Sequence, residues 1–125
     1  MVPTNRNSRG VLSLLLALTL GSWLVSGCGP AGPRALLKGE RLIHEGRYSE
    51  AVENLRAATE LMPRDAVAWN FLGLAYHGNH QPDDALRAYR TALSLDHKLI
   101  AVRFNLGCLL LDQNQFNHKV GGGLD

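Results

Sequence analysis

The chain of 125 residues is long enough for one small domain and too short for two domains with a cleft between them. Its 13 basic and 11 acidic side chains give a formal net charge of +2, which argues against a nucleic-acid-binding protein. The two cysteines, Cys28 and Cys108, lie 80 residues apart in segments of different character, so we expect no disulfide framework. Composition therefore predicts a small, non-catalytic module.

The first 27 residues have the pattern of a secretory signal peptide. Arg6 and Arg9 precede an apolar run over residues 11–24, and no acidic residue accompanies them. This run has 14 residues, whereas a membrane-spanning helix needs about 20. Removal of residues 1–27 would leave 11 basic and 11 acidic side chains, so we expect a mature chain without net charge.

The end of this segment, Val25-Ser26-Gly27-Cys28, resembles the lipobox of bacterial lipoproteins. The resemblance implies cleavage before Cys28 and a diacylglyceryl group on its thiol. Buried acyl carbons contribute about 0.8 kcal/mol per CH₂, so such a lipid would hold the domain on a membrane. The non-acidic Gly29 implies, by the same resemblance, a place in the bacterial cell envelope at the outer membrane, facing the periplasm. An uncleaved signal anchor with an incidental cysteine is the alternative.

The remainder of the chain repeats with a period of 34 residues. Gly39, Gly73 and Gly107 follow one another at this interval. The same step joins pairs of identical residues, namely Ala51 with Ala85, Ala58 with Ala92, Leu61 with Leu95, and Leu72 with Leu106. Periods of this length are typical of solenoid proteins, in which each repeat is one supersecondary unit.

One motif connects this repeat to a known family. The motif that resembles the tetratricopeptide repeat (TPR) signature is Trp69-x2-Leu72-Gly73-x2-Tyr76, followed by Ala85-x3-Tyr89 and Ala92. The resemblance implies an all-α fold, a short TPR solenoid of helix-turn-helix repeats over residues 34–120. Its register gives repeats at residues 32–65 and 66–99 and a partial third at 100–120. Residues 28–33 are then expected to form the lipidated cysteine and a short linker.

Local signals favour a helix pair in each repeat. Apolar and small residues recur at spacings of three and four, which places them on one helix face. Gly46 and Gly78 are expected just after first helices, Asp65 is an expected N-cap, and Pro82 opens a second helix. The glycines of the period, such as Gly73, should let paired helices approach closely.

The third repeat departs from the pattern. The alanine expected at position 119 is Lys119, and residues 121–123 are three glycines, which disfavour helix. We therefore expect residues 100–113 to form the last helix, Phe116 to lie in the turn after it, and residues 121–125 to be a flexible tail. The array then has about two and a half repeats, whereas a continuous core needs about three. A fragment of a longer TPR protein with more repeats or an enzymatic domain is the alternative interpretation.

Candidate chemistry is weak in this sequence. His77 and His80 lie three residues apart, but no third metal ligand is apparent beside them. Cys108 lies among apolar residues, so an inert thiol is a better interpretation than a nucleophile. We therefore predict no enzymatic activity, no metal site and no cofactor.

The surface that TPR proteins use is a concave groove lined by the first helix of each pair. The resemblance carries this role to nine residues, namely Leu36, Glu40, Ile43, Asn70, Leu74, His77, Phe104, Cys108 and Leu111. Their largely apolar character suits an apolar helix or extended segment. Packing within the array would explain the same residues. The prediction is a lipid-anchored scaffold or adaptor that binds another protein, or a second copy of itself in a homo-oligomer, and no nucleic acid.

Overall fold

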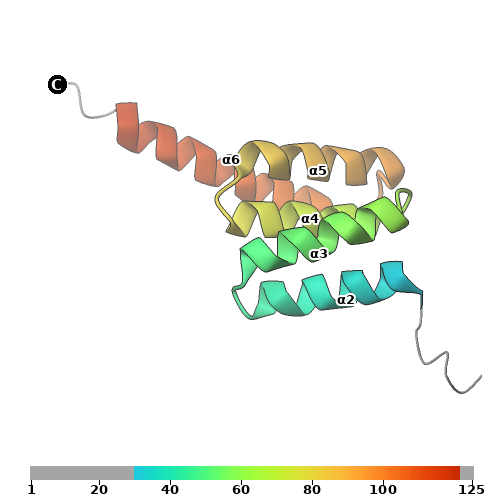
Figure 1. Cartoon of the computed structure of the whole chain (residues 1–125). Coiled ribbons are helices and arrows are strands. Elements are labelled where there is room, and N and C mark those ends of the chain that lie inside the picture. Colours follow the sequence, from blue (N-terminus) through green and yellow to red (C-terminus); the bar gives the residue numbers. More distant parts are fainter. Residues whose placement is uncertain (1–29, 122–125) are drawn as a thin grey trace, which may run out of the picture.

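The computed structural model describes residues 30–121, which form five α-helices and no strand. The helices are α2 (Ala31–His44), α3 (Tyr48–Leu61), α4 (Ala66–Gly78), α5 (Pro82–Leu95) and α6 (Ile100–Gly121), as Figure 1 shows. The expected all-α fold is confirmed. The predicted signal peptide, the lipid-attachment residue Cys28 and residues 122–125 of the predicted tail lie outside the described residues.

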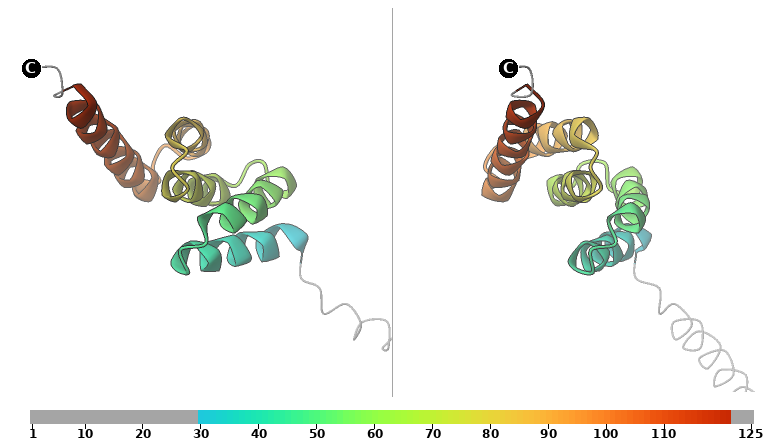
Figure 2. Two further views of the ribbon diagram at one scale, coloured as in Figure 1. Left: turned by 60° about the vertical axis from the view of Figure 1, so that its left-hand side comes forward. Right: turned by 90° about the vertical axis from the view of Figure 1, so that its left-hand side faces the viewer.

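Neighbouring helices pack as hairpins that stack along the chain. Helix α2 packs on α3 and α4 on α5, and the two hairpins meet where α3 contacts α4. Helix α6 packs on α5 and α4 and lies at the end of the array (Figure 2). Because α2 and α4 also touch, the first helices of the pairs share one face, as a TPR solenoid requires.

The turn inside each hairpin contains one residue with left-handed backbone. Gly46 has a φ of 73° between α2 and α3, and His80 has a φ of 59° between α4 and α5. These residues occupy the same position of the 34-residue period. Glycine adopts this conformation without steric cost, whereas a residue with a Cβ is strained there. Within residues 30–121 no other residue has a positive φ.

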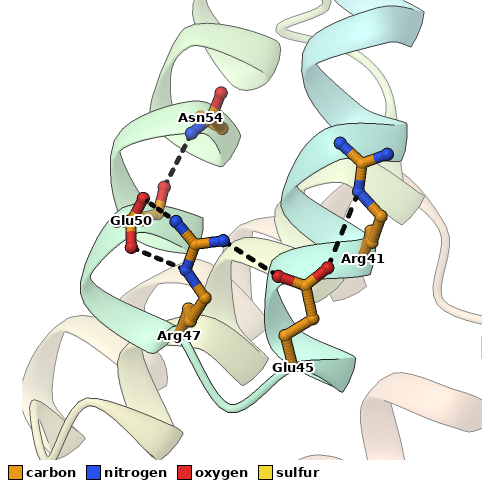
Figure 3. Close-up of polar contacts among 5 residues, drawn as sticks. All are labelled: Arg41, Glu45, Arg47, Glu50 and Asn54. Carbon is orange, nitrogen blue, oxygen red and sulfur yellow. Dashed lines mark hydrogen bonds and ion pairs between the residues drawn. The ribbon is translucent and has the colours of Figure 1, made fainter.

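An exposed network of ion pairs surrounds the first of these turns (Figure 3). Arg47 donates to the Glu50 carboxylate at 2.8 and 2.6 Å and to the Glu45 carboxylate at 3.0 Å. Arg41 lies 3.9 Å from Glu45, and the Asn54 amide donates to the Glu50 carbonyl oxygen. The hydrogen bonds from Arg47 lower the pKa of Glu50. Because these side chains are exposed, the network orients the turn and adds little to the stability of the fold.

Glycine at the repeat period brings paired helices close together. A Cβ on Gly39 would lie 2.4 Å from Leu55 Cγ, and a Cβ on Gly73 would lie 2.5 Å from Tyr89 Cε1. Leu55 and Tyr89 are fully buried, so neither can move aside without disturbing the core. The prediction that these glycines allow close approach is confirmed.

The core consists of two clusters of buried side chains that share their border. The first lies among α2, α3 and α4 and includes Ala88 of α5, and the second lies between α5 and α6. Trp69 and Tyr76 of α4 are half-buried and pack against both clusters. Trp69 Nε1 also donates to the carbonyl oxygen of Pro63, at 3.0 Å. The first helix of the second repeat therefore connects the two halves of the core.

The first helix begins earlier than the sequence predicts. Helix α2 starts at Ala31, so Gly32 and Pro33 of the expected linker lie in its first turn. Proline is tolerated there because the N–H groups of the first turn have no partner within the helix. Gly32 is buried, and a Cβ on it would lie 2.7 Å from Met62 Cγ.

The last helix is longer than the sequence predicts. Helix α6 continues to Gly121 and does not end near residue 113, so Phe116 lies inside a helix and the prediction of a turn there is wrong. Asn114, which occupies the position of Gly46 and His80 in the period, remains helical. Residues 113–120 contain no glycine and no proline, so nothing in this stretch interrupts the helix.

Candidate functional site

The first helices of the pairs surround an open hollow on one face of the array. Its volume is about 1130 Å³. The residues that line it are Ile43, Tyr48, Leu74, His77, Gly78, His80, Pro82, Leu109, Asp112, Gln113, Phe116 and Asn117. We refer to this surface as the hollow. Its lining includes both apolar and polar side chains. It could therefore contact apolar and polar groups of a bound segment.

Two structural features form the walls of the hollow. Residues of α6 from Leu109 to Asn117 contribute at spacings of three and one, which places them on one side of that helix. On the opposite wall, the ring of Tyr48 covers the end of α4, where a Cβ on Gly78 would lie 2.4 Å from Tyr48 Cδ1. The hollow therefore depends on the continuation of α6 past residue 113 and on glycine at position 78.

Two polar contacts connect α4 with α6. The Asn105 side-chain amide donates to Asn70 Oδ1 at 3.0 Å, and Asn70 is buried. His77 Nε2 lies 2.8 Å from Asp112 Oδ2 at the rim of the hollow. In both pairs the partners are 35 residues apart in sequence. These contacts fix the position of α6 along α4, and they occupy polar atoms of two residues expected to face a ligand.

The nine expected groove residues do not form one continuous surface. Ile43, Leu74 and His77 line the hollow. Leu36 packs against the first core cluster, Asn70 is buried in its contact with Asn105, and Glu40 is half-buried. The three on α6 lie outside the hollow, with Phe104 and Leu111 exposed and Cys108 half-buried.

The sequence analysis missed most residues of the hollow. The groove positions of the TPR resemblance also include Gly78 and Asp112, which line the hollow, but Tyr48 was left aside and Phe116 was placed in a turn. The spacing of Leu109, Gln113 and Phe116 was the available signal, because residues separated by three and four share a helix face. It was overlooked because the TPR period led us to expect a break in the helix before Phe116.

The described residues include possible metal ligands and one cysteine. No three His, Cys, Asp or Glu side chains come together there in a way that could hold a metal ion. Cys108 is a free, half-buried thiol. Burial raises the pKa of Tyr89, and an electrostatic interaction with Cys108 raises it further. Among residues 30–121, no helix is long and apolar enough to cross a membrane.

Comparison with known families identifies the helix pairs. A family model described as TPR repeat matches residues 39–79, and a second, described as tetratricopeptide repeat, matches residues 66–99. The second range is the same as the range expected for the second repeat. These matches support a TPR protein.

Curated relatives share the repeats over a short part of their length. The chain is 30% identical over 59 residues to a peroxisomal targeting signal receptor of Kluyveromyces lactis, covering 47% of the chain and 10% of the relative. It is 32% identical over 60 residues to the receptor of the same name in Candida albicans, covering 48% and 10%. It is 33% identical over 87 residues to tetratricopeptide repeat protein 37 of Xenopus laevis, covering 69% and 6%. The chain thus spans a tenth or less of these relatives.

Proposed function

We propose that this TPR protein is a lipid-anchored scaffold or adaptor of the bacterial envelope that holds an apolar segment of another protein in the hollow. TPR repeats and relatives that are receptors support a protein partner in general. The observation that carries the more specific proposal is the hollow itself, where α2, α4 and α6 expose Ile43, Leu74 and Phe116 to one space.

The chemistry of the hollow defines the segment that fits it. Its apolar side chains favour a helix or strand with an apolar stripe, since burial of such a stripe removes both surfaces from water. Asp112 is exposed at the rim and has a second carboxylate oxygen beyond the one that contacts His77. A hydrogen-bond donor on the partner segment would complete this carboxylate. The relatives named as targeting signal receptors support recognition of a short peptide segment.

A peptide selection tests this proposal. Peptides selected from a displayed random library on the full chain in mild detergent should carry an apolar stripe and should compete with one another for one site. Phe116→Asp should weaken their binding at least tenfold, because it places a charge against the apolar stripe. Leu37→Asp is the matched control, since Phe116 and Leu37 are 67% and 64% exposed and Leu37 does not line the hollow. Equal loss in both variants, or no loss in either, would contradict the proposed site.

The lipid anchor is a separate part of the proposal. It is supported by the lipobox-like residues Val25, Ser26 and Gly27 before Cys28. In a bacterial host fed radiolabelled palmitate, the parent chain should be labelled and should fractionate with the outer membrane. Cys28→Ser should lose the label and accumulate as a longer precursor, because position 28 then has no thiol to carry the lipid. Cys108→Ser is the control and should be labelled like the parent. Equal labelling of the Cys28→Ser variant would disprove the anchor.

A further inference from the structure

In the first two repeats, one face of the first helix is covered by the second helix of the pair, α3 on α2 and α5 on α4. The corresponding face of α6 is exposed. Leu110 of α6 is 50% exposed, whereas Leu42, at the same position of the first repeat, is 3% exposed. A Cβ on Gly107 would meet no described atom within 4 Å, in contrast to the close contacts at Gly39 and Gly73. Within residues 30–121, therefore, nothing packs on this side of α6.

The uncovered side carries a regular apolar stripe. Ile100, Phe104 and Leu111 are 77%, 71% and 62% exposed, and Gly107 lies between the last two. The successive spacings of four, three and four place these residues on one line along the helix, as in the seam of a coiled coil. The buried residues of α6 lie on the opposite side, which packs against α5 and α4. We refer to these four residues as the α6 stripe.

We propose that the α6 stripe is the interface of a homodimer, in which α6 of a second copy lies antiparallel to it across a two-fold axis. If the two-fold axis crosses α6 midway between residues 105 and 106, Ile100 lies opposite Leu111 of the second copy. Phe104 then lies opposite Gly107 of the second copy. Each contact then occurs twice, which is what a two-fold interface requires of a single surface.

The pairing of Phe104 with Gly107 has a precedent inside the chain. The ring of Tyr89 packs directly on Gly73, and Leu55 packs on Gly39, at the same position of the repeat as Gly107. Gly39 and Gly73 therefore each leave a space that a large side chain of an adjacent helix occupies, whereas the space at Gly107 is open. In the homodimer the ring of Phe104 fills the third such space, and the helices can approach closely.

The charges beside the α6 stripe permit this pairing. Arg103 is the only charged residue between positions 100 and 111, and its guanidinium donates to the His97 carbonyl oxygen. In the two-fold arrangement Arg103 lies opposite Cys108 of the second copy, and Leu110 lies opposite Ala101. No like charges face each other. Association therefore depends on apolar burial and should change little between low and moderate salt.

The shape of the molecule leaves room for the second copy. Both views in Figure 2 show α6 at the edge of the array, and the left-hand view shows its C-terminal half projecting beyond the other helices. The hollow lies on the side of α6 formed by Leu109, Gln113 and Phe116, away from the α6 stripe. A dimer would thus leave the hollow open, and the two proposals can fail independently.

Sedimentation of the full chain in mild detergent tests for the dimer. The parent should sediment as two copies, with a similar distribution in 50 and 300 mM salt. Phe104→Glu and Gly107→Leu should sediment as one copy, the first by adding a charge and the second by filling the space for Phe104. Neither substitution disturbs packing within one chain, because both positions are open. Val120→Glu is the control and should remain a dimer. A parent with the mass of one copy would overturn the proposal.

Cross-linking tests the antiparallel direction. In a Cys108→Ser background, two differently tagged full-length chains carrying Ile100→Cys and Leu111→Cys are produced together and treated with a short bismaleimide. The mixed pair should cross-link, whereas each variant produced alone should not, because an antiparallel arrangement keeps identical residues about 16 Å apart along the axis. Equal cross-linking within one variant, or none in the mixed pair, would overturn the arrangement. The background chain without added cysteines corrects for any product through Cys28.

Discussion

The ring of Tyr89 stabilises the folded state, whereas its hydroxyl group destabilises it. Its ring fills the space above Gly73 and is fully buried. Its hydroxyl oxygen is also buried and has no hydrogen-bond partner among the described residues. A buried unpaired hydroxyl costs about 1–3 kcal/mol. The ring therefore stabilises the fold through the volume that it fills, and the hydroxyl group opposes folding.

Tyr89→Phe should remove this opposition and also change the response to high pH. Burial raises the pKa of Tyr89 above its ordinary value of 10.0. The folded state therefore holds the hydroxyl proton more tightly than the unfolded state, and ionisation of Tyr89 favours unfolding. Stability is complete below pH 10 and is lost as the pH rises above it, by up to about 1.4 kcal/mol per pH unit. In urea unfolding followed by circular dichroism, Tyr89→Phe should be about 1 kcal/mol more stable at pH 7. Between pH 10 and 11 it should lose less stability than the parent.

Two outcomes would contradict this account of Tyr89. A variant that is less stable than the parent at pH 7 would mean that the hydroxyl has a stabilising partner. Equal pH dependence of the two proteins would mean that Tyr89 ionises as readily in the folded state as in the unfolded state. Cys108→Ser should leave most of the pH dependence of the parent in place, because burial is the larger cause of the shift.

Individual polar contacts were the part of the site that the sequence could not predict. Asn70 and His77 were expected to face a ligand, because they occupy groove positions of the repeat. The structure joins Asn70 to Asn105 and His77 to Asp112, and His77 still lines the hollow. Such pairs depend on the position of α6 along α4 to within a fraction of a turn, which a sequence period does not specify. The apolar residues Ile43 and Leu74 were easier to place, since their helix face alone determines which side of the array they occupy.

At the scale of the helices, most boundaries follow from local signals. Asp65 accepts hydrogen bonds from the N–H groups of Val67 and Ala68, at 2.8 and 3.2 Å, so the expected cap of α4 is confirmed. Pro82 opens α5, also as expected. The length of α6 was predicted wrongly, because the period was used to infer a turn for which residues 113–120 supply no helix-breaking residue. Local sequence was the better guide there.

The packing of α4 on α5 leads to a prediction about glycine. Gly73→Val should lower the free energy of unfolding by about 1–3 kcal/mol, because the added side chain would overlap the ring of Tyr89. Gly107→Val is the same substitution at the same position of the third repeat, where a Cβ meets nothing within 4 Å. In dilute solution, without a second copy on α6, it should leave stability unchanged or slightly raised. Thermal melts by circular dichroism provide the measurement, and equal losses in the two variants would contradict the glycine interpretation.

At the scale of the whole molecule, the 34-residue period determines the architecture. A helix pair cannot bury its apolar side alone, so successive pairs must stack, and the order of contacts follows the order of the chain. This is why the fold could be predicted from spacing while the hollow could not. The hollow arises from how far α6 extends beyond the other helices, and that depends on the residues of a single segment.

The same stacking predicts that the described helices unfold together. Trp69 and Tyr76 pack against both core clusters, so the loss of one cluster exposes side chains that the other also uses. Val102 of α6 is fully buried in the second cluster. Val102→Ala should therefore lower the stability of all five helices by about 2 kcal/mol, through lost burial and a small cavity. In a Trp23→Phe background Trp69 is the only tryptophan, and it lies outside α6. Urea midpoints measured by Trp69 fluorescence and by circular dichroism should coincide in the parent and shift equally in the variant. A circular dichroism signal that falls before the fluorescence changes would mean that α6 unfolds separately and that the two clusters are not one cooperative unit.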